Sequence, residues 1–321
     1  MIFCRDDGSF YQQEHKMFKL HQNKKPSLLV LCSALAALLF IGCRTVHVPE
    51  PEILLPRLPS TLLILDDLEA QERIMRTFAQ AYPGKITDVE FINNDWTMMV
   101  NGVRFYFANG RFLPGDLRER WEEFDPYDFY AYPWVGTVEE RLAIFENPIR
   151  SVGSVFLFDT LWASPTISDS WLQQVAYTFL GVRMLVHNYI ANLLDRVQKR
   201  ILAYAETDLS IKEWIAELQP GPPSGGWNWR YIAGTNRRSL HSYGIAIDLL
   251  PIDLRGRSTY WQWGTVDFDN LYLPPAAVVR AFEFYGFLWG GNWSLIDTMH
   301  FEYRPEILLL NGFVIEHLNQ R

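Results

Sequence analysis

Cysteine is scarce in this chain: only Cys4, Cys32 and Cys43 occur among its 321 residues. Because all three precede residue 44, the rest of the chain has no pair of thiols from which to build a disulfide framework. A folded region beyond that point must therefore be held by core packing, with or without a metal ion. The hydrophobic fraction of 49% is enough for one or two domains with a sizeable core.

Positive charge is also in short supply. The chain has 29 Lys and Arg residues against 37 Asp and Glu residues, which gives a formal net charge of −8. Nucleic-acid-binding domains typically have a basic excess, so we expect no nucleic-acid partner. Aromatic residues make up 15% of the chain, which is typical of packed globular proteins and not of disordered ones.

The N-terminal region lacks an apolar stretch long enough for a comfortable membrane span. The run from Ser27 to Ile41 is roughly 15 residues long, which suits the apolar core of a signal peptide. Lysines precede this run, and Gly42-Cys43 follows it. Its end resembles the lipobox of bacterial lipoproteins, which implies lipidation of Cys43. The alternatives are an ordinary membrane anchor, or a cleaved signal with an incidental cysteine.

Residues 1–16 do not fit a signal peptide, because they carry acidic side chains where such a peptide should be basic. We therefore expect translation to start at Met17. Residues 1–42 are predicted to include the signal peptide, and the proline-rich residues 43–60 an extended tether. The protein is then expected to be an exported, membrane-anchored lipoprotein that faces the periplasm or the cell wall.

Three further segments differ in their patterns. Residues 61–115 combine a helical periodicity with the strong hairpin signal Asn101-Gly102, which predicts a small α+β unit. Residues 116–165 are rich in Trp, Tyr, Phe and Pro, and we interpret them as a connection that packs between units. A sugar-stacking surface is the alternative for this connection. Residues 166–321 are predicted to form the main domain.

Helices and short strands are both expected within these segments. Apolar residues recur every three or four positions from Asp169 to Tyr204, which predicts one long helix with His187 as a structural residue. Ser210 and Glu213 form a capping-box pattern that opens a short helix. The other expected elements are helices at 66–81 and 275–285, and strands at 96–100, 103–107, 245–250, 287–289 and 299–303.

Two short segments concentrate the residues that can do chemistry. One surrounds His241 and Asp248, and the other surrounds His300. A hydrolytic zinc site needs three nitrogen or oxygen ligands and one open position for water, and these three residues supply the ligands. Asp248 lies in an otherwise apolar run, where a carboxylate is costly to bury unless it is paired or bound to metal. This is the strongest reason to predict Asp248 as a ligand.

Acidic residues flank His300 on both sides. Asp297 lies three residues before it, so Asp297 can face the water that zinc activates while His300 binds the metal. We predict that Asp297 is the general base, which takes a proton from that water and passes it to the leaving amine. Glu302 shares the face of His300 on a predicted strand and is expected to accept a hydrogen bond from a ligand histidine.

The two segments together resemble the zinc D-Ala-D-Ala carboxypeptidase and L-Ala-D-Glu endopeptidase family of cell-wall peptidases. The first signature of that family, S-x-H-x-x-G-x-A-x-D, matches Ser239 to Asp248. The second, an acidic residue followed by x-x-H-F-E, matches Asp297 to Glu302. The resemblance covers residues 225–310, and the combination of residue identity, spacing and order makes it specific.

The resemblance implies zinc as cofactor, with the same ligands and base as above. It also implies a compact α+β fold, with a small antiparallel sheet flanked by helices as in the D,D-peptidase and hedgehog-like zinc peptidase core. The N-terminal α+β unit is then an addition to that core. Family members carry an upstream arginine that binds substrate, for which Arg230 is the first candidate and Arg238 the second. Ser239 either contacts substrate or shapes the turn before His241.

The predicted substrates are the stem peptides of peptidoglycan. The carboxypeptidase branch of the family usually has glutamate as its base, whereas the endopeptidase branch has aspartate. Asp297 therefore favours cleavage at L-Ala-D-Glu, with D,D-carboxypeptidase activity as the other interpretation. A non-catalytic lipoprotein module that binds zinc or wall peptide is the alternative of a different class. Retention of all three ligands and the base disfavours it.

Overall fold

The computed structural model describes residues 67–127, 129–137, 140, 155–232, 237–260 and 268–318. The predicted signal peptide (1–42), the predicted lipidation site Cys43 and the tether (43–60) lie outside these residues. In the part of the chain that the structure describes, no helix has the length and apolar character needed to cross a bilayer.

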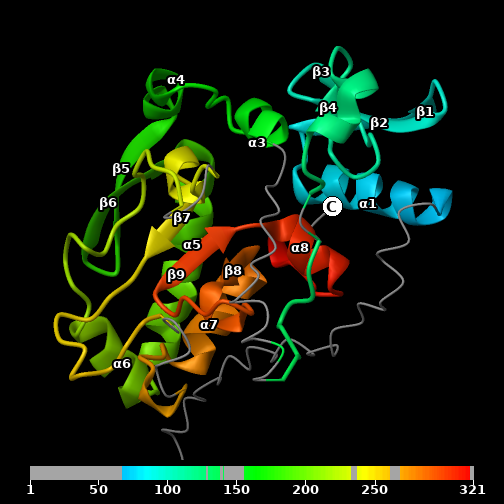
Figure 1. Ribbon diagram of the computed structural model, residues 1–321. Helices are drawn as coiled ribbons and strands as arrows, with labels where there is room; N and C mark the ends of the chain where they lie inside the picture. Colours follow the sequence, from blue (N-terminus) through cyan, green and yellow to red (C-terminus); the bar gives the residue numbers. More distant parts are fainter. Residues whose placement is uncertain are drawn as a thin grey trace, which may run out of the picture. The chain divides into compact units, whose positions relative to one another are not determined.

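The N-terminal unit begins with the predicted helix, α1 (Leu68–Ala81) (Figure 1). The side chain of Asp67 caps it by accepting a hydrogen bond from the amide of Glu69. One stripe of α1 is buried, and its members are Ala70, Ile74, Met75, Phe78 and Ala81. The helix ends immediately before Tyr82, whose side chain is fully buried.

A four-stranded antiparallel sheet completes this unit (Figure 1). Its strands, in the order β1-β2-β3-β4, are β1 (Ile86–Ile92), β2 (Asp95–Val100), β3 (Val103–Tyr106) and β4 (Leu113–Pro114). Asn101 and Gly102 join β2 to β3 with φ values of 46° and 85°, the left-handed conformation that a tight hairpin turn requires. The short 3-10 helix η2 (Arg118–Glu123) follows. The predicted N-terminal α+β unit is confirmed.

The long helix predicted from Asp169 to Tyr204 is wrong. The structure has a short helix, a β-hairpin and a helix in that region: α4 (Ile167–Leu172), β5 (Gln174–Phe179), β6 (Val182–His187) and α5 (Asn188–Ala205). Leu180 and Gly181 make the hairpin turn with φ values of 47° and 89°. Apolar residues spaced three and four apart also fit a strand pair that buries alternate positions, so the spacing alone did not separate the two structures.

The described residues from 155 onwards form the second unit, and short elements make up the rest of it. They are α3 (Val155–Leu161), α6 (Leu209–Ala216), η3 (Leu240–Tyr243), β7 (Ala246–Asp248), η4 (Phe268–Asn270), α7 (Ala276–Phe284), β8 (Phe287–Trp289), η5 (Gly290–Asn292), β9 (His300–Tyr303), α8 (Pro305–Leu310) and η6 (Glu316–Leu318). Asp208, not Ser210, caps α6, so this helix begins earlier than the capping-box pattern predicted. Strands β7, β9 and β8 form an antiparallel sheet with β9 in the middle. The α+β fold with small antiparallel sheets and helices is thus as predicted.

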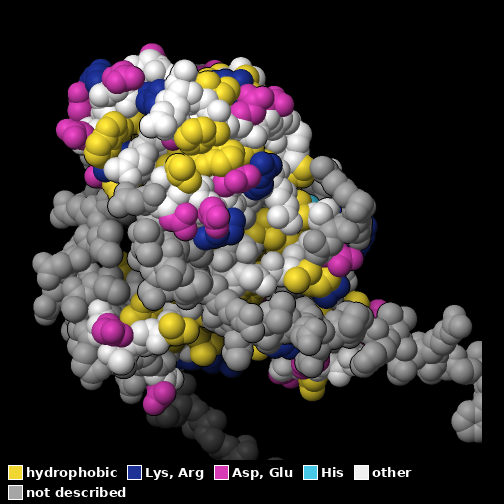
Figure 2. All heavy atoms as spheres, turned by 90° about the vertical axis from the view of Figure 1, so that its right-hand side faces the viewer, with side chains coloured by type: hydrophobic (Ala, Val, Ile, Leu, Met, Phe, Trp, Pro, Cys, Tyr) yellow, Lys and Arg dark blue, Asp and Glu magenta, His cyan; other side chains and the backbone are white. Residues whose placement is uncertain are grey.

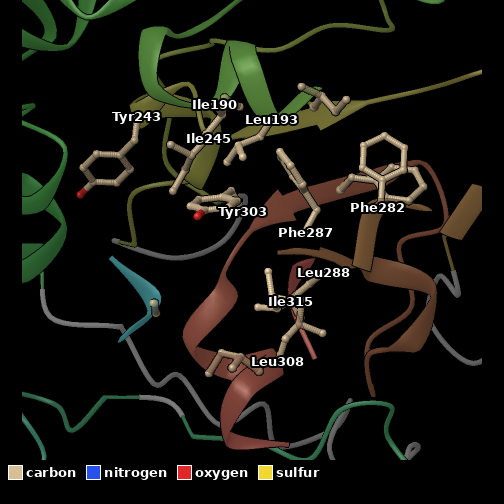
Figure 3. Close-up of a cluster of buried hydrophobic side chains, with 14 of the residues drawn as sticks. Ile190, Leu193, Tyr243, Ile245, Phe282, Phe287, Leu288, Tyr303, Leu308 and Ile315 are labelled. Carbon is tan, nitrogen blue, oxygen red and sulfur yellow. The ribbon is translucent and has the colours of Figure 1, made fainter. Parts of the chain in front are cut away.

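A dense apolar core supports this three-stranded sheet. Figure 3 shows Ile190 and Leu193 of α5, Phe282 of α7, Phe287 of β8 and Tyr303 of β9 gathered in it. Each of these side chains is buried, and burial of a large apolar side chain contributes about 1.5–3 kcal/mol. The buried side chains of the N-terminal unit belong to the same cluster, and α1 packs against α8. The sheet that carries the chemistry is therefore supported from both units.

The surface in Figure 2 carries both signs of charge. Acidic and basic side chains are intermixed over this face, with apolar side chains between them. The net charge of −8 is thus not gathered into one acidic patch on the face in view.

Gly244 makes the turn that connects η3 to β7. It has φ +72°, and its carbonyl accepts a hydrogen bond of 2.8 Å from the amide of His187. A Cβ at this position would lie 2.8 Å from that amide nitrogen and 1.9 Å from Oε1 of Gln174. The glycine of the sequence signature is therefore needed both for its left-handed conformation and for close contact with the β5–β6 hairpin.

Substitution of Gly244 should destabilise the protein by more than the cost of placing a non-glycine residue in the left-handed conformation. Gly256 is a matched control, because it has φ +76° and a Cβ added there would meet nothing within 4 Å. We expect Gly256→Ala to lower the free energy of unfolding by roughly 1–2 kcal/mol, and Gly244→Ala to lower it clearly further because of the clash. Urea unfolding of both variants checks this. Equal losses would contradict the close-contact argument.

Candidate metal centre

The register of two neighbouring strands sets up the candidate metal centre. β7 pairs with β9 so that Asp248 lies directly opposite His300. Side chains at opposed positions project to the same face of a sheet and are about 4.5–5.5 Å apart at Cβ. The short 3-10 helix η3 brings His241 to the same place. Ser239 caps this helix, because its side chain accepts a hydrogen bond of 3.4 Å from the His241 amide. Residues 59 positions apart in the sequence are thereby brought together.

The three predicted ligands converge on one point. His241 Nε2 lies 3.2 Å from an oxygen of Asp248 and 3.2 Å from Nδ1 of His300. His300 Nδ1 lies 3.0 Å from the other oxygen of Asp248. The two imidazoles are 2% and 7% exposed, so this group is largely withdrawn from water. Among the described residues, this is the group of His, Cys, Asp and Glu side chains that could hold a metal ion.

Each imidazole has one nitrogen hydrogen-bonded outside the three candidate ligands, and this contact decides which nitrogen faces the other two ligands. His241 Nδ1 lies 2.6 Å from the carbonyl oxygen of Gly226, which can only accept, so Nδ1 carries the hydrogen. His300 Nε2 lies 3.1 Å from Oε2 of Glu302, which accepts in the same way. Each histidine therefore directs its other nitrogen towards Asp248. Such outer partners are typical of histidines that bind metals.

The charges of His241, Asp248 and His300 favour a proton or a metal ion among them. Burial alone would raise the pKa of Asp248, yet the two adjacent histidines hold it below its usual range. Burial opposes the charged form of His300, but hydrogen bonds to Asp248 and Glu302 raise its pKa to about 10. Three lone pairs within 4.8 Å of one another repel unless a proton or a metal ion lies among them. Two imidazoles and one carboxylate are a donor set that zinc accepts.

Asp297 lies beside this group in a buried turn. Its amide donates to the carbonyl of Gly290 at 3.0 Å, and its own carbonyl accepts from the His300 amide. A Cβ on Gly290 would lie 2.4 Å from that carbonyl oxygen of Asp297, so only glycine permits this turn. Burial raises the pKa of Asp297 to about 7, and the charge of Asp248 adds to the effect. Oδ1 of Asp297 has no hydrogen-bond partner among the described residues.

The other predicted site residues separate into two groups. Arg230 has an exposed side chain whose positive charge lowers the pKa of Asp297, so its field reaches the metal centre. Arg238 instead forms an ion pair of 2.9 Å with Asp159 and donates to the carbonyl of Ser164. The guanidinium of Arg238 is thus already bound to α3 through Asp159. Arg230 is therefore the better candidate for the arginine that faces substrate. Ser239, 4% exposed, shapes the turn before His241.

Tyr260 is a site residue that the sequence did not indicate. Burial raises the pKa of its phenol, and the nearby charges of Asp297 and Asp248 raise it further. Its backbone forms a bridge with Asp297, and its side chain is 37% exposed. The ring centroid of Trp293 lies 5.3 Å from that of His300. Tyr260 belongs to no spacing pattern in the sequence, so only the folded chain reveals its position.

Comparison with known families agrees with this geometry. No curated protein and no solved structure matches the chain. Residues 74–129, which include most of α1 and the four-stranded sheet, match a family described as a domain of unknown function (DUF8518). Residues 233–303, which include the three candidate ligands and Asp297, match the family described as D-alanyl-D-alanine carboxypeptidase. The chain therefore carries, at residues 233–303, a domain of the D-alanyl-D-alanine carboxypeptidase family.

Proposed function

We propose that the protein is a zinc-dependent peptidase that hydrolyses the stem peptides of peptidoglycan. The observation that carries this proposal is the convergence of His241, Asp248 and His300, with the carboxylate of Asp297 beside them, inside a domain of a peptidase family. Bound zinc would supply Lewis acidity, which activates water and polarises a peptide carbonyl. Retention of a base next to the ligands favours catalysis over a module that only binds zinc or wall peptide.

Asp297 is the proposed general base. Its Oδ1 is buried and without a hydrogen-bond partner among the described residues, so this oxygen is available to accept a proton. A pKa of about 7 lets the same carboxyl group return that proton to a leaving amine. The amide and the carbonyl of Asp297 are both hydrogen-bonded, which fixes its backbone, and the Met299 amide donates to its carboxylate. The chain thus supplies a pre-positioned proton acceptor at little further cost in entropy.

Arg230 is the proposed contact for a carboxylate of the substrate. Its backbone is held by hydrogen bonds with Ser242, while its side chain remains exposed. A guanidinium binds carboxylate through two parallel hydrogen bonds, so it can select peptides by charge and orientation. Tyr260 lies within the electrostatic reach of both Arg230 and Asp297 and is a further candidate to contact substrate.

The bond cleaved is proposed to be L-Ala-D-Glu. This choice depends on the aspartate at position 297, since the resembling carboxypeptidases usually have glutamate as their base. D,D-carboxypeptidase activity is the second candidate, which the family description of residues 233–303 favours. We further propose that lipidation of Cys43 keeps the enzyme at a membrane next to the cell wall, on the strength of the signal-like run before it.

Metal content and turnover should separate the roles of the ligands and the base. We expect about one zinc ion per wild-type chain, and loss of both zinc and activity in His300→Ala, because one of three ligands is removed. Asp297→Asn should keep zinc and lose roughly 10²–10⁴ in kcat. Elemental analysis and hydrolysis of purified muropeptides check these outcomes. Asp253→Asn, an exposed acidic position, is the control, and full activity of Asp297→Asn would disprove the assigned base.

The pH dependence should show the ionisation of Asp297. A general base works as the carboxylate, so kcat/KM should be full above its pKa and fall about tenfold per pH unit below it. The pKa of Asp297 is raised to about 7 by burial, and a bound cation would lower it by favouring the charged form. The midpoint of the acid limb is therefore expected at or below about pH 7. A pH–rate profile without any acid limb would contradict this role.

Products from a defined stem peptide should identify the scissile bond. Endopeptidase activity would separate L-Ala from the D-Glu-containing remainder, whereas carboxypeptidase activity would remove only the terminal D-Ala. We expect the first pattern in mass spectra of the reaction. Intact peptide after incubation with the zinc-loaded protein, together with measurable binding, would instead support the non-catalytic module.

A further inference from the structure

A row of buried charges continues from the candidate metal centre through the end of β9 into the start of α8. Side chains alternate along a strand, so Glu302 shares the face of His300 on β9. Arg304 follows directly after β9, as the N-cap residue of α8. Glu306 comes two residues later, in the first turn of α8. The exposures of Glu302, Arg304 and Glu306 are 6%, 7% and 0%. We call these three side chains the charge row, and each of them must find partners within the protein because water does not reach it.

The charge row is linked to His300 through Glu302. One carboxylate oxygen of Glu302 faces His300 Nε2 at 3.1 Å, and the other faces Arg304 Nη1 at 3.4 Å. Arg304 also donates through Nε to Glu306. The guanidinium is therefore shared between two carboxylates, one of which orients a candidate metal ligand.

The N-terminal unit supplies the remaining partners of Glu306. Tyr82 donates to one oxygen of Glu306, and Tyr127 donates to the other at 2.6 Å. Tyr127 also accepts a hydrogen bond of 2.6 Å from Arg304 Nη2. Both phenols are buried, and burial raises the pKa of each, which keeps them neutral and able to donate. These contacts join residues 224 and 179 positions apart in the sequence.

Glu302 and Glu306 compete for hydrogen bonds from the guanidinium of Arg304. Glu306 is fully buried, so it needs several donors, and Arg304 is the one charged donor that contacts it in the described residues. The two tyrosine hydroxyls donate hydrogen bonds to Glu306. Without them, Glu306 would need further hydrogen bonds from the guanidinium of Arg304. With both hydroxyls present, Arg304 can also reach Glu302 and hold its carboxylate towards His300. Removing one member of a buried ionic network leaves its partners without a hydrogen bond, which is strongly destabilising. We therefore expect the remaining side chains to change their hydrogen bonds together.

We propose that Tyr82 and Tyr127 are positioning residues for the metal centre, which act through the charge row to hold the imidazole of His300. The unit of unknown function at residues 74–129 thereby has a role in assembling the zinc site. This inference rests on the proposed function, since it requires that His300 binds zinc. It differs from simple packing between units, because packing alone would leave metal affinity and ligand geometry unchanged.

Removal of the two hydroxyls tests this role in the full-length protein. Tyr82→Phe, Tyr127→Phe and the double variant keep the rings and remove only the donors. Tyr272→Phe, at a buried tyrosine outside the charge row, is the matched control. Zinc affinity is measured by competition with a chromophoric chelator, and the geometry of the ligands by the visible absorption spectrum of the cobalt-substituted protein. We expect zinc binding to weaken roughly 10–100-fold in the double variant, with a shifted cobalt spectrum.

The outcomes distinguish this inference from the proposed function. Wild-type zinc affinity and an unchanged cobalt spectrum in the folded double variant would overturn the positioning role and leave the peptidase proposal standing. Absence of zinc binding by the wild-type protein would overturn both. If the double variant does not fold, the single Tyr127→Phe variant decides, with an expected loss of affinity that Tyr272→Phe does not share. A loss of ring packing cannot explain that difference, because the phenylalanine rings fill the same space.

Discussion

The antiparallel register of β7 against β9 is the constraint on which the candidate metal centre depends. It sets Asp248 opposite His300, and a slip of one residue would turn one of the two side chains to the other face of the sheet. The same register fixes Glu302 against Ala246, so the hydrogen-bonding partner of His300 is set together with the ligand itself. The sheet is small, and its rigidity comes from the aromatic and aliphatic core beneath it rather than from its own length.

Buried charge is the main energetic cost that this register imposes. Asp248 and Glu302 each lie within hydrogen-bonding distance of His300 in a largely dry site. Such groups destabilise a fold unless each has an opposite charge or a metal ion. The arrangement is therefore better explained by chemistry than by stability. The fully buried Glu306 adds a further polar network inside the apolar core that the N-terminal unit shares.

The local patterns predicted the site better than they predicted the fold around it. Spacing singled out the three residues that the fold brings together, because signature residues on a turn and two strands keep fixed relative positions once those strands pair. The strand β1 and the β5–β6 hairpin were missed, since their apolar spacing did not favour strand over helix. Arg238 and Tyr260 could not be assigned from sequence, because their roles depend on Asp159 and Asp297, which are distant in the chain.

The separation of the interacting residues also bears on how the protein folds. The two strands that carry Asp248 and His300 meet only after the 52-residue loop between them has closed, and the contact between Tyr127 and Glu306 closes a loop of 179 residues. Long loops make such contacts late events in folding, because the entropy of closure is lost before the contact stabilises the chain. The candidate ligands and the network at Glu306 are thus both assembled late in folding. Metal uptake would then mark the end of folding instead of nucleating it.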